Sequence, residues 1–270
     1  MILELAALAT LLAGTTSPNQ PKPNVVIVTA RDFSLEIPAS IPAGVTTFKL
    51  VNKGKLAHHV MIVRLDAGRS AAEALKVVMS VGRAPRPEWM HPVGGPQAVT
   101  PGIEGNATLI LEPGNYLAFC EVPGPDTTAH YMRGMAKAFT VTGPPRAGTL
   151  PAADVALSLT EYDFAFTTPL TRGRHVVAVT NRGSQAHMVV LTRFPPGKGT
   201  ADFLAWAKNP QGRPGPGTTM GGVTEIPPGA TVTFTRNFIP GHYGMICFTP
   251  DAKDGKPHFM HGMQKEFEVR

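Results

Sequence analysis

Two cysteines, with the histidines and methionines around them, are the residues of this chain best suited to chemistry. Each cysteine is followed by a histidine and then by a methionine, and an isolated histidine lies about 60 residues upstream. The spacings are C-x9-H-x4-M in the first series and C-x10-H-x4-M in the second. The two series are His58, Cys120, His130 and Met135, and His187, Cys247, His258 and Met263.

Two imidazoles, a thiolate and a weak axial thioether form the donor set of one-electron copper sites. The soft sulfur donors favour Cu(I), and the imidazoles also suit Cu(II). A disulfide between Cys120 and Cys247 is the alternative in an exported protein. It is disfavoured because the cysteines hold equivalent positions in two repeats, so a bond would require two separate cores to meet. We predict two type 1-like copper sites; in a protein that acts as a scaffold, one or both would lack copper.

The chain repeats itself at an offset of about 128 residues. The first histidine recurs after 129 residues, the cysteine after 127 and the last methionine after 128. The pair Asp32-Phe33 is also matched, to Asp163-Phe164. The longer matching blocks are Val51–Val63 with Thr180–Thr192, Gly114–Cys120 with Gly241–Cys247, and His130–Met135 with His258–Met263. Several matches at nearly one offset indicate a tandem duplication.

The duplication predicts two domains, 24–142 and 154–270, joined by a Pro/Gly/Ala-rich linker at 143–153. Each domain contains six short apolar or alternating runs bounded by Gly and Pro, a pattern typical of an antiparallel β-sandwich. One helix is expected in each domain, over 70–80 and 200–208. The first has a Ser70–Glu73 capping box, and the second has Thr200 at the cap position.

These blocks resemble the cupredoxin superfamily over 24–142 and 154–270, which implies an all-β protein of two tandem Greek-key β-sandwiches, each with one short helical insert. The Asn-x-Gly turn before His58 and the Y-x3-C segment resemble plastocyanin-type proteins, and the H-x4-M end resembles the type 1 site of copper nitrite reductases. The resemblance carries over the eight ligands named above. A catalytic copper in those enzymes also needs a His before the Cys or paired H-x-H motifs. Phe119 and Ile246 stand there instead and no H-x-H occurs, so we expect no enzymatic activity.

The N-terminus and the charge bear on location and partners. Residues 1–23 combine an apolar run at 1–14 with a Pro-containing linker, and they are interpreted as an export signal or an anchor that contacts a membrane. The net charge is +6, but Lys and Arg are scattered, which argues against binding to nucleic acid. Four residues flank the ligands: His59, His261, Met132 and Met260. They could replace a ligand or make the site one for copper trafficking, but residues in such positions more often fill the rim of a site.

Three functions remain open from the sequence. The first is a one-electron copper module, and the second is a structural subunit on the external face of a membrane electron-transfer assembly. The third is a free periplasmic copper carrier or chaperone. The whole chain is also similar to cupredoxin-fold accessory subunits of bacterial photosynthetic reaction-centre–light-harvesting complexes. This implies a periplasmic, membrane-associated protein whose partner is a membrane-bound redox or photosynthetic complex.

Overall fold

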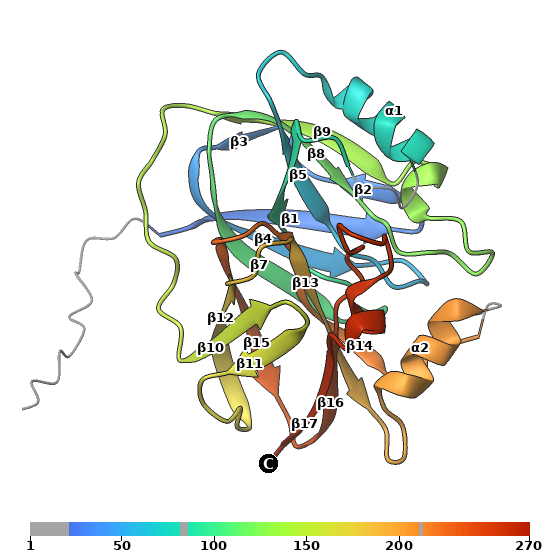
Figure 1. Ribbon diagram of the computed structural model, residues 1–270. Helices are drawn as coiled ribbons and strands as arrows, with labels where there is room; N and C mark the ends of the chain where they lie inside the picture. The colour runs from blue at the N-terminus through green and yellow to red at the C-terminus, as the bar shows by residue number, and fades with distance from the viewer. Residues whose placement is uncertain (1–21, 82–85, 211–212) are drawn as a thin grey trace, which may run out of the picture.

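The computed structural model describes residues 22–81, 86–210 and 213–270 (Figure 1). The predicted signal or anchor at 1–14 lies outside these residues. The described part contains α1 (Ala71–Val81), α2 (Thr200–Lys208) and the short 3-10 helices η1 (His130–Arg133) and η2 (His258–His261), and its other regular elements are strands. The prediction of an all-β fold with one short helical insert in each half is confirmed. Neither helix has the length and apolar character that a membrane crossing requires.

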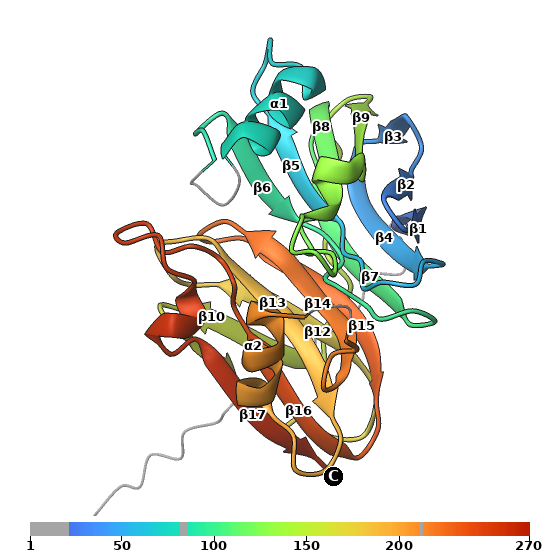
Figure 2. The same ribbon diagram turned by 90° about the vertical axis from the view of Figure 1, so that its right-hand side faces the viewer.

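The strands of each half form two layers (Figure 2). In the first half, one layer contains β1 (Asn24–Arg31), β2 (Ser34–Glu36), β4 (Gly44–Asn52) and β7 (Glu104–Leu111); the other contains β3 (Ser40–Pro42), β5 (Met61–Leu65), β6 (Met90–Gly94), β8 (Gly114–Phe119) and β9 (Ala136–Thr142). In the second half, one layer contains β10 (Val155–Thr160), β11 (Asp163–Phe166), β12 (Gly173–Asn181) and β15 (Thr231–Phe238); the other contains β13 (His187–Phe194), β14 (Thr218–Ile226), β16 (Gly241–Ile246) and β17 (Gln264–Val269).

Alternating burial packs the layers against each other. In β4 every second side chain is buried, among them Phe48 and Leu50, because successive residues of a strand point to opposite faces of the sheet. Tyr116 of β8 and Phe139 of β9 come from the facing layer and stack with their ring centroids 5.1 Å apart. The resulting core runs without interruption through both halves.

Three strand pairs differ from the predicted antiparallel arrangement. β3 pairs parallel with β9, β1 pairs parallel with β4, and β10 pairs parallel with β12. The hairpin strand that follows β1 or β10 runs back to the starting end of the sheet. The chain therefore enters β4 or β12 from the same end as the first strand, and the two strands run in the same direction.

The two halves share an extensive backbone contact. β7 pairs with β15, which joins one layer of each half into a single eight-stranded sheet. The Asn106 side chain reinforces this edge by bonding the backbone of Thr235 twice, each time at 2.7 Å. Residues 95–100 also bond β14, for example through Gln97 N to Gly222 O at 3.3 Å and Gly221 N to Ala98 O at 2.9 Å.

Both helices have local signals for their starts. Ser70 and Glu73 form the predicted capping box, with Glu73 N donating to Ser70 Oγ at 3.2 Å and Ser70 N donating to the Glu73 carboxylate at 2.8 Å. The prediction for α2 is wrong by one residue. Gly199 is the N-cap, and Thr200 lies in the first turn, where its N–H and its hydroxyl both donate to Glu266.

Candidate metal centres

The predicted histidines and cysteines meet at one end of each sandwich. In the first half, His58 follows the turn after β4, Cys120 follows β8 directly, and His130 opens η1. All three residues are completely buried. In the second half, His187 opens β13, and Cys247 and His258 occupy the matching positions after β16 and at the start of η2, again completely buried.

An asparagine fixes the turn that carries the first histidine. Asn52 donates to Leu56 O at 2.8 Å and to Val99 O at 2.9 Å, and it accepts from Gly54 N at 2.9 Å. Asn181 makes the same three bonds in the second half, at 2.7, 2.9 and 2.9 Å. The side chain thus closes the turn and ties it to Val99 in the first half and to Ile226 of β14 in the second. These bonds fix the position of the histidine that follows the turn.

A carboxylate that the sequence analysis did not assign holds the outer nitrogen of the first histidine. Asp32 Oδ1 lies 3.0 Å from His58 Nε2 and also accepts from Lys55 N and Leu56 N. Burial raises the pKa of Asp32, but these hydrogen bonds outweigh it and the net shift is downward, so the carboxylate is ionised.

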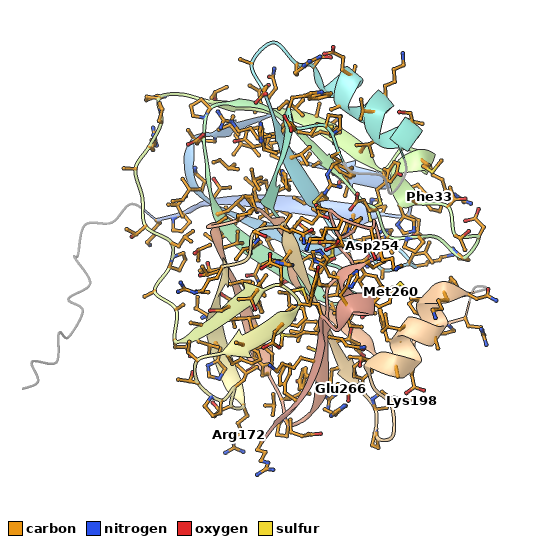
Figure 3. The ribbon with its side chains drawn as sticks, viewed as in Figure 1. Phe33, Arg172, Lys198, Asp254, Met260 and Glu266 are labelled. Carbon is orange, nitrogen blue, oxygen red and sulfur yellow. The ribbon has the colours of Figure 1, made fainter. Side chains whose placement is uncertain are left out.

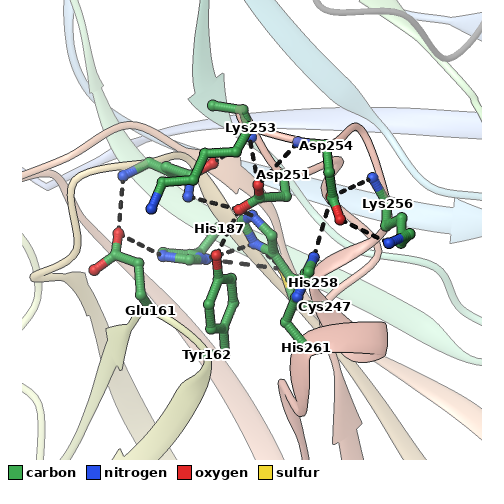
Figure 4. Close-up of polar contacts among 12 residues, drawn as sticks. Glu161, Tyr162, His187, Cys247, Asp251, Lys253, Asp254, Lys256, His258 and His261 are labelled. Atoms are coloured by element: carbon green, nitrogen blue, oxygen red, sulfur yellow. Dashed lines mark hydrogen bonds and ion pairs between the residues drawn. The ribbon is translucent and has the colours of Figure 1, made fainter.

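The second half uses a glutamate for the same purpose (Figure 4). Glu161 Oε1 accepts from Ser184 N and Gln185 N and lies 3.6 Å from His187 Nε2. The match of Asp32-Phe33 to Asp163-Phe164 is therefore wrong by two residues. The structural equivalents are Glu161 and Tyr162, which occupy the same turn after the first strand of the half. The sequence match was misled because an identical Asp-Phe pair stands two residues further on.

The long Cys-to-His spacing is absorbed by a closed loop. His130 N donates to Val122 O at 3.0 Å, and Tyr131 N donates to Cys120 O at 2.9 Å. The residues between Pro123 and Ala129 form a loop of their own, which is closed by a bridge between these two residues. The second half repeats this arrangement, with His258 N bonded to Thr249 O, Phe259 N bonded to Cys247 O, and a bridge between Pro250 and Pro257. The extra residues therefore do not move the histidine away from the cysteine.

The donor atoms of the first group converge. His58 Nδ1 and His130 Nδ1 lie 3.1 Å apart, and Cys120 Sγ lies 3.6 Å from His130 Nδ1. Because His58 Nε2 faces Asp32, the proton of the neutral ring belongs there, and the lone pair of Nδ1 points toward the other two donors. The sulfur also accepts the backbone N–H of His59 at 3.5 Å.

The second group has nearly the same geometry (Figure 4). His187 Nδ1 and His258 Nδ1 lie 3.0 Å apart, and Cys247 Sγ lies 3.5 Å from His258 Nδ1 and 4.0 Å from His187 Nδ1. Met188 N donates to the sulfur at 3.4 Å, as His59 N does in the first group. In each half the three donor atoms lie within 4.8 Å of one another.

These distances fit a metal ion. Imidazole nitrogens about 2.0–2.1 Å and a thiolate about 2.3 Å from one first-row ion are separated from each other by about 3–4 Å. Burial lowers the pKa of His130 and of His258 to about 4, so both rings are neutral and able to bind a metal near neutral pH. Burial raises the pKa of the Cys120 thiol to about 12, and that of Cys247 also upward. A metal ion would have to displace the thiol proton, as is usual for cysteine ligands.

The two predicted axial methionines lie beside these groups. Met135 and Met263 are completely buried. Cys120 N donates to Met135 O and Cys247 N donates to Met263 O, each at 3.1 Å, so the backbone of each methionine is bonded directly to that of its cysteine. A left-handed glycine, Gly134 at φ 99° or Gly262 at φ 102°, precedes each methionine and turns the chain into the next strand.

The flanking residues divide into buried and exposed ones. His59 does not belong to the rim, because only 5% of it is exposed and it packs inside the molecule. Met132 and Met260, by contrast, are about half exposed, at 48% and 59%. Figure 3 shows Met260 on the lower sandwich and Phe33 on the upper one, where the Phe33 ring packs edge-on against His130 with centroids 5.3 Å apart.

No family model matches this sequence, and no curated protein matches it. Among solved structures, the chain is similar to reduced auracyanin from the photosynthetic bacterium Roseiflexus castenholzii, at 20% identity over 44% of this chain and 98% of that chain, with a TM-score of 0.33. It is also similar to auracyanin A, a blue copper protein of Chloroflexus aurantiacus, at 19% identity over 45% and 100% of the two chains, with a TM-score of 0.33. A blue copper oxidase from Nitrosomonas europaea is similar at 14% identity over 92% of this chain and 86% of that chain, with a TM-score of 0.29.

These likenesses concern the fold. The names of the second and third similar structures state that they are copper proteins, and this chain carries two His–Cys–His groups that could hold a metal ion. Copper is the metal that this donor set indicates.

The expectation that the chain is not an enzyme is contradicted by the comparison that covers most of it. The similar structure that spans 92% of this chain is named an oxidase, which is an enzyme. The expectation rested on Phe119 and Ile246 and on the lack of an H-x-H motif. Those features concern one way of holding a catalytic copper, and they do not extend to every enzyme that has this fold. At this level of identity the match assigns no particular reaction.

Proposed function

We propose that this chain is an exported one-electron-transfer protein in which each half binds one copper ion. The observation that carries the proposal is the pair of buried His–Cys–His groups, which have nearly the same geometry in both halves. His58, Cys120, His130 and Met135 would be the ligands in the first half, and His187, Cys247, His258 and Met263 in the second. Bound copper would supply the change between Cu(I) and Cu(II).

The surrounding residues would hold the ligands in nearly the same positions in the Cu(I) and Cu(II) states. Asp32 fixes the ring of His58 from outside, and the closed Cys-to-His loop fixes His130. The His59 N–H directed at Cys120 Sγ stabilises negative charge on the sulfur. Because the ligands are completely buried, water has little access, and the donors have little freedom to rearrange when the oxidation state changes.

The test is the copper content and the visible spectrum of protein isolated from its own source. We expect two copper ions per chain and an intense thiolate-to-copper absorption band that disappears on reduction. Cys120→Ser and Cys247→Ser should each remove one copper and part of the band, and the double variant should remove both. Protein that is loaded with copper and shows no such band would contradict the proposal.

For the partner we propose a membrane-bound redox complex, of the photosynthetic kind that the sequence resemblance implies, contacted on its extracytoplasmic face. The net charge of +6 supports attraction to an acidic docking surface or an anionic membrane. Contact of residues 1–14 with the membrane is part of this proposal. We expect the protein to co-purify with such a complex at low salt and to be released as salt screens the attraction. Recovery only in the free soluble fraction at low salt would contradict it.

A further inference from the structure

A continuous series of contacts connects the sulfur atoms of the two cysteines. It begins at Cys120 Sγ, which accepts the backbone N–H of His59 at 3.5 Å. The ring of His59 is bonded back to the same strand end, because its Nε2 accepts the N–H of Glu121 at 2.7 Å. His59 is therefore attached to the first metal group through both its backbone and its side chain.

The hydrogen bonds fix the ring of His59 in one tautomer. Since Nε2 accepts, the proton of the neutral ring lies on Nδ1, which donates to Gln97 Oε1 at 2.9 Å. Burial lowers the pKa of His59, in agreement with a neutral ring. Gln97 Oε1 also accepts from Ala98 N at 2.8 Å, so the amide oxygen faces the first half and the amide NH2 faces the second.

The amide of Gln97 then bridges the two halves. Gln97 Nε2 donates to Met188 Sδ and to Val223 O, both at 3.5 Å. Met188 follows the ligand histidine of the second half, and its backbone N–H donates to Cys247 Sγ at 3.4 Å. Covalent bonds and hydrogen bonds thus lead from one sulfur to the other through three side chains: His59, Gln97 and Met188.

The path lies in a dry and ordered part of the molecule. The exposed fractions are 5% for His59, 1% for Gln97 and 6% for Met188. Around it the backbone is paired on both sides: Val99 exchanges two hydrogen bonds with His58, and Gln97 N bonds Gly222 O of β14. Electronic coupling between metal sites weakens less through covalent and hydrogen bonds than across gaps, and it benefits from a fixed geometry.

We propose that His59, Gln97 and Met188 form an intramolecular electron-transfer path between the two copper sites. This inference rests on the proposed function, because it needs copper in both halves. The step moves one electron: the donating site changes from Cu(I) to Cu(II) and the accepting site from Cu(II) to Cu(I). No proton moves and no bond forms or breaks: the single N–H proton of the His59 ring stays on Nδ1, where it is donated to Gln97.

The experiment injects an electron next to one site and follows its arrival at the other. A photosensitiser is attached to the full-length, copper-loaded Met260→Cys protein, where the exposed position lies in η2 beside the second site and the two native cysteines are buried. After a flash, rapid freezing and electron paramagnetic resonance report the oxidation state of each copper. The Cys120→Ser and Cys247→Ser proteins provide the signal of each single site. We expect first-order redistribution whose rate does not depend on protein concentration.

Met188→Leu tests the path itself. It preserves side-chain volume and the N–H to Cys247, but it removes the sulfur that Gln97 contacts. We expect several-fold slower redistribution with unchanged spectra of both sites. The matched control is Met220→Leu, another buried methionine at the contact between the halves that is not part of the path, and it should leave the rate unchanged.

The outcomes separate this inference from the proposed function. Two results would overturn the path and leave the proposed function standing, provided that both copper spectra are normal. One is an unchanged redistribution rate in Met188→Leu, and the other is a rate that depends on protein concentration. Failure to obtain the thiolate-to-copper band would overturn the proposed function, and the path would fall with it.

Discussion

At the scale of single residues, contacts to the outer nitrogen of each ligand histidine determine how its ring is oriented. The carboxylate of Asp32 or Glu161 directs the lone pair of the first histidine inward. Among the described residues, Nε2 of His130 and of His258 has no hydrogen-bond partner, and Nε2 of His187 has only the 3.6 Å ion-pair contact with Glu161. A buried polar atom without a partner carries a free-energy cost.

The pKa shifts at these groups predict how many protons metal binding releases. Burial lowers the histidine pKa values, to about 4 for His130 and His258. Near pH 7 the rings are therefore neutral and release no proton when they bind a metal. Burial raises the pKa of Cys120 to about 12 and that of Cys247 upward, so each thiol keeps its proton until metal arrives. We expect one proton released for each ion, and an affinity that rises about tenfold per pH unit between pH 6 and 8.

The measurement is calorimetric titration of the metal-free protein with Zn(II), which is redox-inert and accepts the same donors. Buffers of different ionisation enthalpy give the number of protons released. The Cys120→Ser protein, which retains one thiol site, is the control and should release one proton in total. Release of two protons per ion would mean that a histidine is charged in the free protein.

At the scale of elements, the turn before each first histidine leaves no room for a side chain. A Cβ on Gly54 would lie 2.4 Å from Asp32 Oδ1 and 2.6 Å from His58 Nε2. A Cβ on Gly183 would lie equally close to Glu161 and His187, at 2.5 and 2.7 Å. Glycine is therefore required where the carboxylate and the histidine meet across this turn.

Gly54→Ala should break the contact between Asp32 and His58 and destabilise the fold by about 1–3 kcal/mol, the usual range for an overpacked site. Copper or Zn(II) binding in the first half should weaken, while the second half keeps its affinity. Gly215→Ala is the matched control, because its nearest contact would be Trp206 at 3.6 Å, an ordinary distance. Equal unfolding free energies and metal affinities for the two variants, measured by denaturant titration and calorimetry, would argue against this role of Gly54.

The sequence predicted those elements whose residues repeat or alternate. Both helices and the matched strands follow from such patterns, and the ligand residues follow from the duplication. Five strands lie outside the predicted runs. Pro92 and Gly94 interrupt the apolar run of β6, and Gly221 and Gly222 interrupt that of β14. The other three, β2, β3 and β11, are only three or four residues long. The carboxylates were missed because an identical Asp-Phe pair, two residues beyond Glu161, was matched instead. The domain boundaries at 142–154 remain a prediction.

At the scale of the whole molecule, the two halves are held together by more than backbone pairing. Arg86 forms ion pairs with Glu121 of the first half and with Glu225 of β14. The Glu225 side chain is only 4% exposed. A buried carboxylate of this kind needs a partner, because an uncompensated charge in the interior is strongly destabilising. No contact of this kind was foreseen from the sequence, since its members are far apart along the chain.

Arg86→Met should destabilise the protein by about 3–5 kcal/mol, the range seen when one partner of a buried ion pair is removed. Adding Glu225→Gln to this variant should restore part of the loss, because the unpaired charge is then gone. Arg31→Met also removes one positive charge but breaks an exposed pair with Glu36, and it should cost at most about 1 kcal/mol. Denaturant unfolding measures all three proteins. A similar cost for Arg86→Met and Arg31→Met would contradict the structural role of Arg86.

The backbone pairing between the halves has approximate twofold symmetry, because segments that correspond in the two repeats pair with each other. Pro96 pairs with Val223, its own counterpart at an offset of 127, and β7 pairs with its counterpart β15 in antiparallel fashion. This is the isologous arrangement of a twofold homodimer, here carried on one chain. In a true homodimer, a residue at one position appears on both sides of the axis. Fusion lifts that restriction: the counterpart of His59 is Met188, and the counterpart of Gln97 is Thr224. A one-sided connection across the axis, such as the one through His59, Gln97 and Met188, therefore requires two halves that differ in sequence, and the fused chain allows that difference.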